Sequence, residues 1–245
     1  CGTSPYDLMS RPLEADSGEP IDLRTLRVAL APDFGVAPVD NGILATFEAR
    51  TEALRPLFRE VIPFDTTLTH AREVFWILRS VAFLTNHLDR YREHGDSLSP
   101  NIRANVEAGL EMSAEQVAWA YGEWANLVDD FNAVFETADV VLTPGNATPA
   151  FLLSQGIPRE INGQPLETYM DASVVRSTLT LTGNPVAAVP CGLDHTKMPF
   201  GFQITGQRGQ DRRLLAMCCA LEAEMAGDPT LGRPVPDLEK LASNG

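Results

Sequence analysis

The stretch that decides the fold is residues 181–206, which reads LTGNPVAAVPCGLDHTKMPFGFQITG. It contains two short apolar runs, residues 186–189 and 200–204, on either side of a polar turn around Asp194 and His195. Short apolar runs bounded by glycine and proline are typical of β-strands. The pattern therefore predicts a tight pair of strands near the end of the chain.

Outside this strand pair, strands alternate with helices along the chain. Short apolar runs predict three further strands, at residues 26–30, 61–64 and 140–142. Two of the predicted helices have cap signals, namely Ser99 before Pro100, and Ser113 with Gln116 three residues later. Pro56 should kink or end the helix that begins near residue 41. Such alternation favours an α/β sheet covered by helices over separate all-α and all-β domains.

The segment between residues 145 and 166 is rich in proline, glycine, asparagine and glutamine and lacks periodicity. We expect a loop there, over the surface or over a pocket. A helix should follow from about residue 167 to residue 181. The last clear helix should present Leu214, Cys218 and Leu221 on one face, and the tail after Gly227 should be irregular.

The net charge of the chain limits the classes of partner that it can bind. Its 245 residues include 33 acidic and only 19 basic side chains, which gives a formal net charge of -14. Such a polyanion repels nucleic-acid phosphates and anionic lipid surfaces. We therefore expect neither nucleic acid nor a membrane as a partner, and no apolar run is long enough to span a bilayer. The sequence leaves a homodimer open.

The motifs give no reason to expect a cofactor or a metal. The sequence contains neither GxGxxG, GxxxxGK[ST] nor GxSxG, and its four histidines form no HExxH or other compact ligand set. Its four cysteines include no CxxC pair, and Cys191 at a strand end is interpreted as a packing residue. This cysteine usage fits a reducing cytoplasm better than an extracellular location.

The blocks around the strand pair resemble a known family. They read GNPVAAVPCG at residues 183–192, PFGFQITG at 199–206 and DRRLL at 211–215. This order is similar to the C-terminal block of the amidase signature family, in which a strand bounded by glycine and proline precedes a P-x-G-x-Q-x-x-G strand and a D-x-x-L-L helix. Residues 139–144, DVVLTP, and the stretches 26–40 and 2–9 are also similar to the family, so the resemblance runs from about residue 2 to residue 224.

The resemblance implies a fold and indicates which portion of that fold this chain would form. Family members have an α/β fold with a mixed β-sheet covered by helices on both faces. They hydrolyse amides, and some esters, with a serine nucleophile activated through a second serine on a cis peptide bond and a lysine. Residues 1–245 would form the C-terminal portion of this single domain. The catalytic half would then lie upstream of the segment that residues 2–9 resemble.

We accordingly expect no catalytic residue in this chain. It has no GGSSGG-like segment for an oxyanion hole, and its two lysines, Lys197 and Lys240, match no catalytic position of the family. The family's C-terminal half supplies part of the pocket for a small-molecule amide, and we expect Thr143, Asn146 and Phe151 to line it. An ordinary surface loop is the alternative for these three positions. The isolated chain should therefore be inactive. It should also have an apolar sheet edge with no strand paired to it.

Two other functions remain open at the level of sequence. The chain could be a non-catalytic, degenerate relative or a scaffold that binds a partner. It could also belong to the branch of the family that works as one component of a glutamine amidotransferase complex. We rank this second alternative below a stand-alone amidase, because the tyrosine-rich segment associated with that branch is absent before Gly183.

Overall fold

The fold centres on one mixed β-sheet. The computed structural model describes residues 3–6, 10, 20–236 and 238–239. The strands of this sheet are β1 Arg27–Leu30, β2 Glu60–Pro63, β3 Val140–Pro144, β6 Val186–Leu193 and β7 Pro199–Gly206. They lie in the order β2-β1-β3-β7-β6. β1 pairs in parallel with β2 and β3, whereas β7 runs antiparallel to both β3 and β6.

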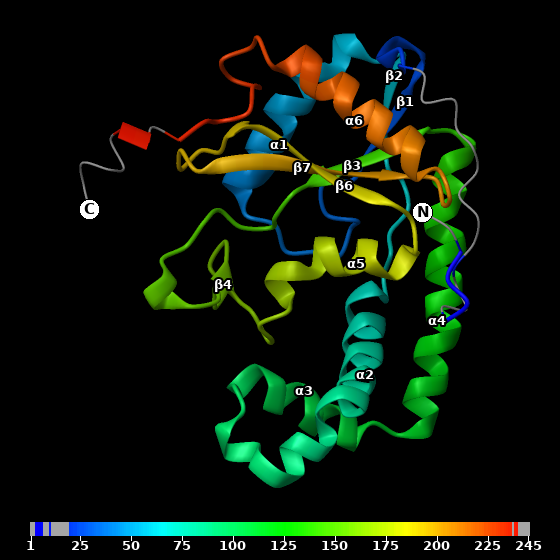
Figure 1. Ribbon diagram of the computed structural model, residues 1–245, viewed down its shortest axis with the longest axis vertical. Coiled ribbons are helices and arrows are strands. Elements are labelled where there is room, and N and C mark those ends of the chain that lie inside the picture. Colours follow the sequence, from blue (N-terminus) through cyan, green and yellow to red (C-terminus); the bar gives the residue numbers. More distant parts are fainter. Residues whose placement is uncertain (1–2, 7–9, 11–19, 237, 240–245) are drawn as a thin grey trace.

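Helices lie on both sides of this sheet. In the described residues they are α1 Asn41–Leu54, α2 Ala71–His94, α3 Pro100–Glu111, α4 Ala114–Asn132, α5 Val174–Thr182 and α6 Asp211–Met225. The ring of Phe47 in α1 meets that of Phe202 in β7 at a centroid distance of 5.8 Å, so α1 packs on the face that α6 also covers through Leu214. Figure 1 shows α6 on one side of the sheet and α5 on the other, with α3 far from the sheet at the end of α2. The prediction of a mixed sheet covered by helices on both faces is confirmed.

Local sequence signals account for several helix ends. Ser99 caps α3, and Ser113 and Gln116 form the reciprocal capping box that begins α4. α1 ends before Pro56, which lies in the 3₁₀ turn Arg55–Leu57, because a proline has no N–H for the helix ladder. No helix in the described parts of the chain is long and apolar enough to cross a membrane.

The strand pair β6–β7 has one covered face and one half-open face. Phe202 and Ile204 of β7 are fully buried on the covered face. On the other face of β6, Val186 is 40% exposed and Ala188 is also exposed. Among the described strands none pairs with the outer edge of β6, which ends the sheet. This edge therefore presents both unpaired backbone groups and apolar side chains.

The segment between β3 and α5 departs from the expected loop and helix. It contains a small hairpin of β4 Glu160–Ile161 and β5 Gln164–Pro165, joined by a turn in which Asn162 and Gly163 have positive φ. The predicted helix from residue 167 is wrong at its start, because α5 begins only at Val174. Before it, side-chain hydrogen bonds hold the backbone in a turn instead of a helix. Two sequence inferences lie wholly or partly outside the described residues, for Lys240 and for residues 2 and 7–9 of the stretch 2–9.

Candidate functional site

A cavity of 420 Å³ opens beside the start of β7. One wall is the loop of residues 146–158, a second is the segment from Tyr169 to Arg176, and a third comes from residues 199–201 at the start of β7. Its volume lies within the range of small-molecule sites, and its lining combines apolar side chains with a few polar ones. This cavity is the candidate substrate site.

Close contact between β3 and β7 fixes the first wall. The backbone N–H of Gly145 donates to the carbonyl of Gly201 at 2.8 Å, and the amide of Gln203 donates to the Gly145 carbonyl at 3.0 Å. A Cβ atom on Gly145 would lie 2.7 Å from the Gly201 carbonyl oxygen, so a larger residue cannot keep this approach. The glutamine of the P-x-G-x-Q strand therefore holds the start of the loop that bears Asn146.

The hairpin of β4 and β5 fixes the far end of the same loop. The side chain of Asn162, at its tip, accepts a hydrogen bond from the Asn41 N–H at 2.9 Å and donates one to the Val39 carbonyl at 2.9 Å. Both partners lie at the start of α1, which packs on the sheet. The tip of the hairpin is thus attached to the rigid part of the fold through one side chain.

Tyr169 ties the second wall to the helices α2 and α3. Its hydroxyl oxygen accepts hydrogen bonds from Asn105 of α3 at 2.7 Å and from Arg79 of α2 at 3.2 Å. Asn105 is fully buried, and the Arg79 guanidinium lies 4.6 Å from the centre of the Phe83 ring. Two donors and a cation–π contact therefore set the position of this cavity-lining tyrosine.

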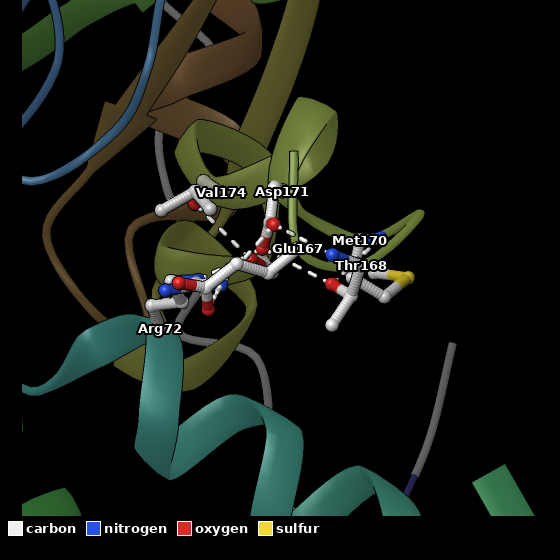
Figure 2. A network of polar contacts seen from close by, with 7 residues as sticks. Arg72, Glu167, Thr168, Met170, Asp171 and Val174 are labelled. Atoms are coloured by element: carbon white, nitrogen blue, oxygen red, sulfur yellow. Dashed lines mark hydrogen bonds and ion pairs between the residues drawn. The ribbon is translucent and has the colours of Figure 1, made fainter. Parts of the chain in front are cut away.

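A second anchor lies two turns earlier on α2. Figure 2 shows Arg72 reaching Asp171 and Glu167 on the segment that precedes α5. The Arg72 Nε donates to Asp171 at 2.8 Å, and its Nη2 donates to Glu167 at 2.6 Å and to Asp171 at 3.1 Å. Asp171 also accepts from the backbone N–H and the hydroxyl of Thr168 at 2.8 and 3.0 Å. Since Arg72 and Arg79 are seven residues apart, they share one face of α2 and hold the same segment.

The charges of this anchor are mutually stabilised. Burial alone would raise the pKa of Asp171, but hydrogen bonds from Arg72 and Thr168 outweigh burial and hold that pKa below its ordinary value of 3.8. The hydrogen bond to Asp171 in turn raises the pKa of Arg72. The pair is therefore ionised at neutral pH, and it attaches the segment before α5 to α2.

The three pocket residues expected from the sequence lie in two different places. Asn146 and Phe151 line the cavity, and Phe151 is 50% exposed. Thr143 is fully buried on β3, opposite Gln203, and is not among the residues lining the cavity. Their role in substrate binding stays a prediction. Sequence reasoning missed Tyr169, because its position in the cavity depends on long-range contacts.

No described side chain forms an evident amide-cleaving centre. Lys197 is exposed in the turn between β6 and β7, with a φ of 66°. Burial raises the pKa of Cys191 to about 12, so this thiol stays protonated and is a poor nucleophile. No cluster of three or more His, Cys, Asp or Glu side chains suited to a metal occurs in the part of the chain that the structure describes.

Comparison with known proteins defines the class. The sequence model of the family described as Amidase matches residues 1–215, which include the sheet strands and the cavity walls. The chain belongs to the amidase family.

Particular relatives are similar over nearly the whole chain. A glutamyl-tRNA(Gln) amidotransferase subunit of Rhodospirillum rubrum is 26% identical over 256 residues, which cover 92% of this chain and 49% of the relative. The 2-amino-5-chloromuconic acid deaminase of Comamonas testosteroni is 28% identical over 225 residues, covering 88% of this chain and 47% of the relative. The chain thus spans about half the length of the curated relatives that it matches.

A solved structure shows the same fold. A bacterial aryl acylamidase belonging to the amidase signature enzymes superposes with a TM-score of 0.69 at 21% identity, covering 87% of this chain and 47% of that chain. At this level of identity the likeness concerns the fold alone.

Proposed function

We propose that this chain is the C-terminal portion of an amidase that hydrolyses a carboxamide to a carboxylate and ammonia or an amine. The observation behind this proposal is the family match over residues 1–215, which contain a cavity of substrate size. In this proposal the catalytic serines and lysine lie upstream of residue 1. Residues 1–245 contribute sheet, helices and part of the pocket, with Asn146 and Phe151 on its wall and Thr143 in the strand beneath.

The open edge of the sheet supports an upstream half in the same domain. β6 is an edge strand of eight residues, and its exposed Val186 is apolar. A long edge of this kind is a template for pairing with another strand. The relatives are about twice as long as this chain, which leaves room for such a partner strand upstream. Unpaired, the edge should make residues 1–245 prone to aggregate when expressed alone.

The test compares residues 1–245 with the product of the complete reading frame. Ammonia release from a panel of aliphatic and aryl carboxamides is measured for both. We expect turnover only by the complete protein, and we expect replacement of its upstream nucleophilic serine by alanine to abolish it. Lys197→Ala in the complete protein is the matched control, since this exposed turn residue should leave the rate unchanged. Turnover by residues 1–245 alone would show that catalysis was assigned to the wrong half.

A second candidate rests on a specific observation, because several of the relatives are named as a subunit of glutamyl-tRNA(Gln) amidotransferase. In that function the protein would work as one component of a larger complex. The net charge of -14 favours the stand-alone amidase, since an acidic surface repels a tRNA backbone. Affinity purification of the tagged complete protein distinguishes the two. Stoichiometric partner proteins favour the amidotransferase, and an uncomplexed protein or a homodimer favours the amidase.

We further propose that the protein works in the cytoplasm. The described cysteines Cys191, Cys218 and Cys219 are free thiols, which fits a reducing compartment. Fractionation of the native cells, followed by detection with an antibody, tests this location. Recovery of the protein outside the cytoplasm would exclude it.

A further inference from the structure

Two arginines border two cavities that are both lined by Met170, and the surroundings of the two arginines differ. Arg72 borders a cavity of 430 Å³, where Asp171 and Glu167 already neutralise its charge. Arg176 lines the 420 Å³ candidate substrate site. Its guanidinium donates to the hydroxyl of Ser173 at 2.8 Å, and no carboxylate of the described residues lies within ion-pair distance of it. Arg176 is solvent-exposed and lines the cavity, so its guanidinium is accessible to a ligand that enters there.

The other charged residue of the candidate site does not compete for Arg176. Asp194 lines the same cavity, but its Oδ1 accepts hydrogen bonds from the Thr196 N–H at 2.7 Å, from the Thr196 hydroxyl at 2.7 Å and from the Met198 N–H at 3.0 Å. These bonds close the turn between β6 and β7. The Oδ1 atom of Asp194 is therefore engaged in its own turn, and Arg176 is the cationic side chain among the described residues that line the cavity.

We propose that this cavity binds a substrate with a carboxylate group in addition to its amide, and that Arg176 is the counter-ion of that carboxylate. The proposal rests on the proposed function and names its substrate class. The planar guanidinium matches a carboxylate with two parallel hydrogen bonds, and the hydroxyl of Ser173 lies beside it as a further donor. Phe151 and Phe200, which line the same cavity, suit a carbon skeleton or an aromatic ring between the two groups.

The chemistry favours a carboxylate over a phosphate. A phosphate monoester carries nearly two negative charges at neutral pH, whereas the cavity offers one cation among its described lining residues. One guanidinium balances one carboxylate. The apolar side chains around it suit an uncharged skeleton better than a strongly hydrated dianion.

The experiment uses the complete protein with two matched probes, 4-carbamoylbenzoate and its methyl ester. They share the ring and the amide and differ in the negative charge. Dissociation constants are measured by calorimetry, and KM and kcat by ammonia release, for the wild type, Arg176→Gln and Arg159→Gln. Arg159 is the control, because it is exposed on the neighbouring loop and does not line the cavity.

The wild type should bind the acid about tenfold more tightly than the ester, and Arg176→Gln should remove about that factor from the acid alone. The loss should appear in KM and the dissociation constant, with kcat changed by about twofold or less, because the arginine contacts a group remote from the amide. Arg159→Gln should behave as the wild type. If neither probe is hydrolysed, the dissociation constants still decide the role of Arg176, while the panel of carboxamides decides the amidase function. An acid that binds no better than its ester, or an equal loss for both probes in Arg176→Gln, would overturn the proposal.

Discussion

The strand pair β6–β7 and the cavity-lining segment of residues 145–173 are held in place by different means. The strand pair is fixed by a backbone register that runs from Val186 opposite Thr205 to Pro190 opposite Gly201, with an irregularity before Leu193. In the segment, the described strands are β4 and β5, which have two residues each. The side chain of Asn162 attaches the segment to α1, and that of Asp171 attaches it to α2. Single substitutions should therefore move the cavity wall more easily than the sheet.

The largest effect is expected at the buried charged attachment. Asp171→Asn keeps the size of the side chain but removes the charge that faces Arg72, and the side chain of Asp171 is only 6% exposed. We expect the complete protein to lose about 3 kcal/mol in its free energy of unfolding, measured by urea denaturation. Glu167→Gln is the control, because this second partner of Arg72 is 78% exposed and should contribute about 0.5 kcal/mol. Equal losses for the two variants would mean that burial does not decide the strength of this anchor.

The next effect tests the contact that joins the two regions. Gly145→Ala places a Cβ atom 2.7 Å from the carbonyl oxygen of Gly201 and should destabilise the protein by about 2 kcal/mol, as β3 and β7 are pushed apart. Gly122→Ala is the control, since Gly122 lies within α4 and nothing lies within 4 Å of an added Cβ. That variant should gain about 1 kcal/mol from better helix propensity. A neutral Gly145→Ala would show that the loop can shift away from β7.

A smaller effect separates two contributions of Asn162 in the β4–β5 hairpin, namely its side-chain hydrogen bonds and its backbone conformation. Asn162→Ala removes both hydrogen bonds to the start of α1 and leaves a non-glycine residue at a φ of 53°. Asn162→Gly removes the same bonds but tolerates that φ. We expect the free energy of unfolding, obtained from denaturation midpoints, to fall by about 2 kcal/mol for Asn162→Ala and by about 1 kcal/mol for Asn162→Gly. If Asn162→Gly were as stable as the wild type, the hydrogen bonds between the hairpin and the start of α1 would contribute nothing to stability.

The smallest effect concerns the dependence of the protein's stability on pH. The pKa of Asp171 in the folded protein lies below its ordinary value of 3.8, so the unfolded chain takes up a proton more readily than the folded one. The stability that this group contributes is complete above its ordinary pKa and is lost as the pH falls through its folded pKa. The stability difference between the wild type and Asp171→Asn should therefore stay constant near neutral pH and shrink as the pH falls from about 5 to values below 3.8. A difference independent of pH would show that Asp171 acts by shape and not by charge.

Much of the fold followed from local patterns. Ser113 with Gln116 marked a helix start, Pro56 marked a helix end, and the runs around residues 186–189 and 200–204 marked the paired strands. Asn162-Gly163 is a typical two-residue hairpin turn, and it would have predicted β4 and β5 inside the expected loop.

The start of α5 could not be predicted in the same way. Residues 167–173 have no strong helix breaker, and a helix from residue 167 is a fair expectation from their sequence. In the structure, Asp171 binds Thr168 and Arg72, which lies 99 residues earlier in the chain. Hydrogen bonds to a buried charged group outweigh the small propensities of a single helical turn.

The sequence by itself determined the family blocks, the order of strands and helices and the acidic character of the chain, because these depend on residue type and short-range spacing. Only the tertiary structure decided that Tyr169 and Arg176 share a cavity with Asn146 and Phe151, and that Thr143 lies buried outside its lining. The physical reason is the distance between partners along the chain. Arg72, Arg79 and Asn105 hold the cavity wall from helices that lie far from it in sequence, and no local pattern encodes such contacts.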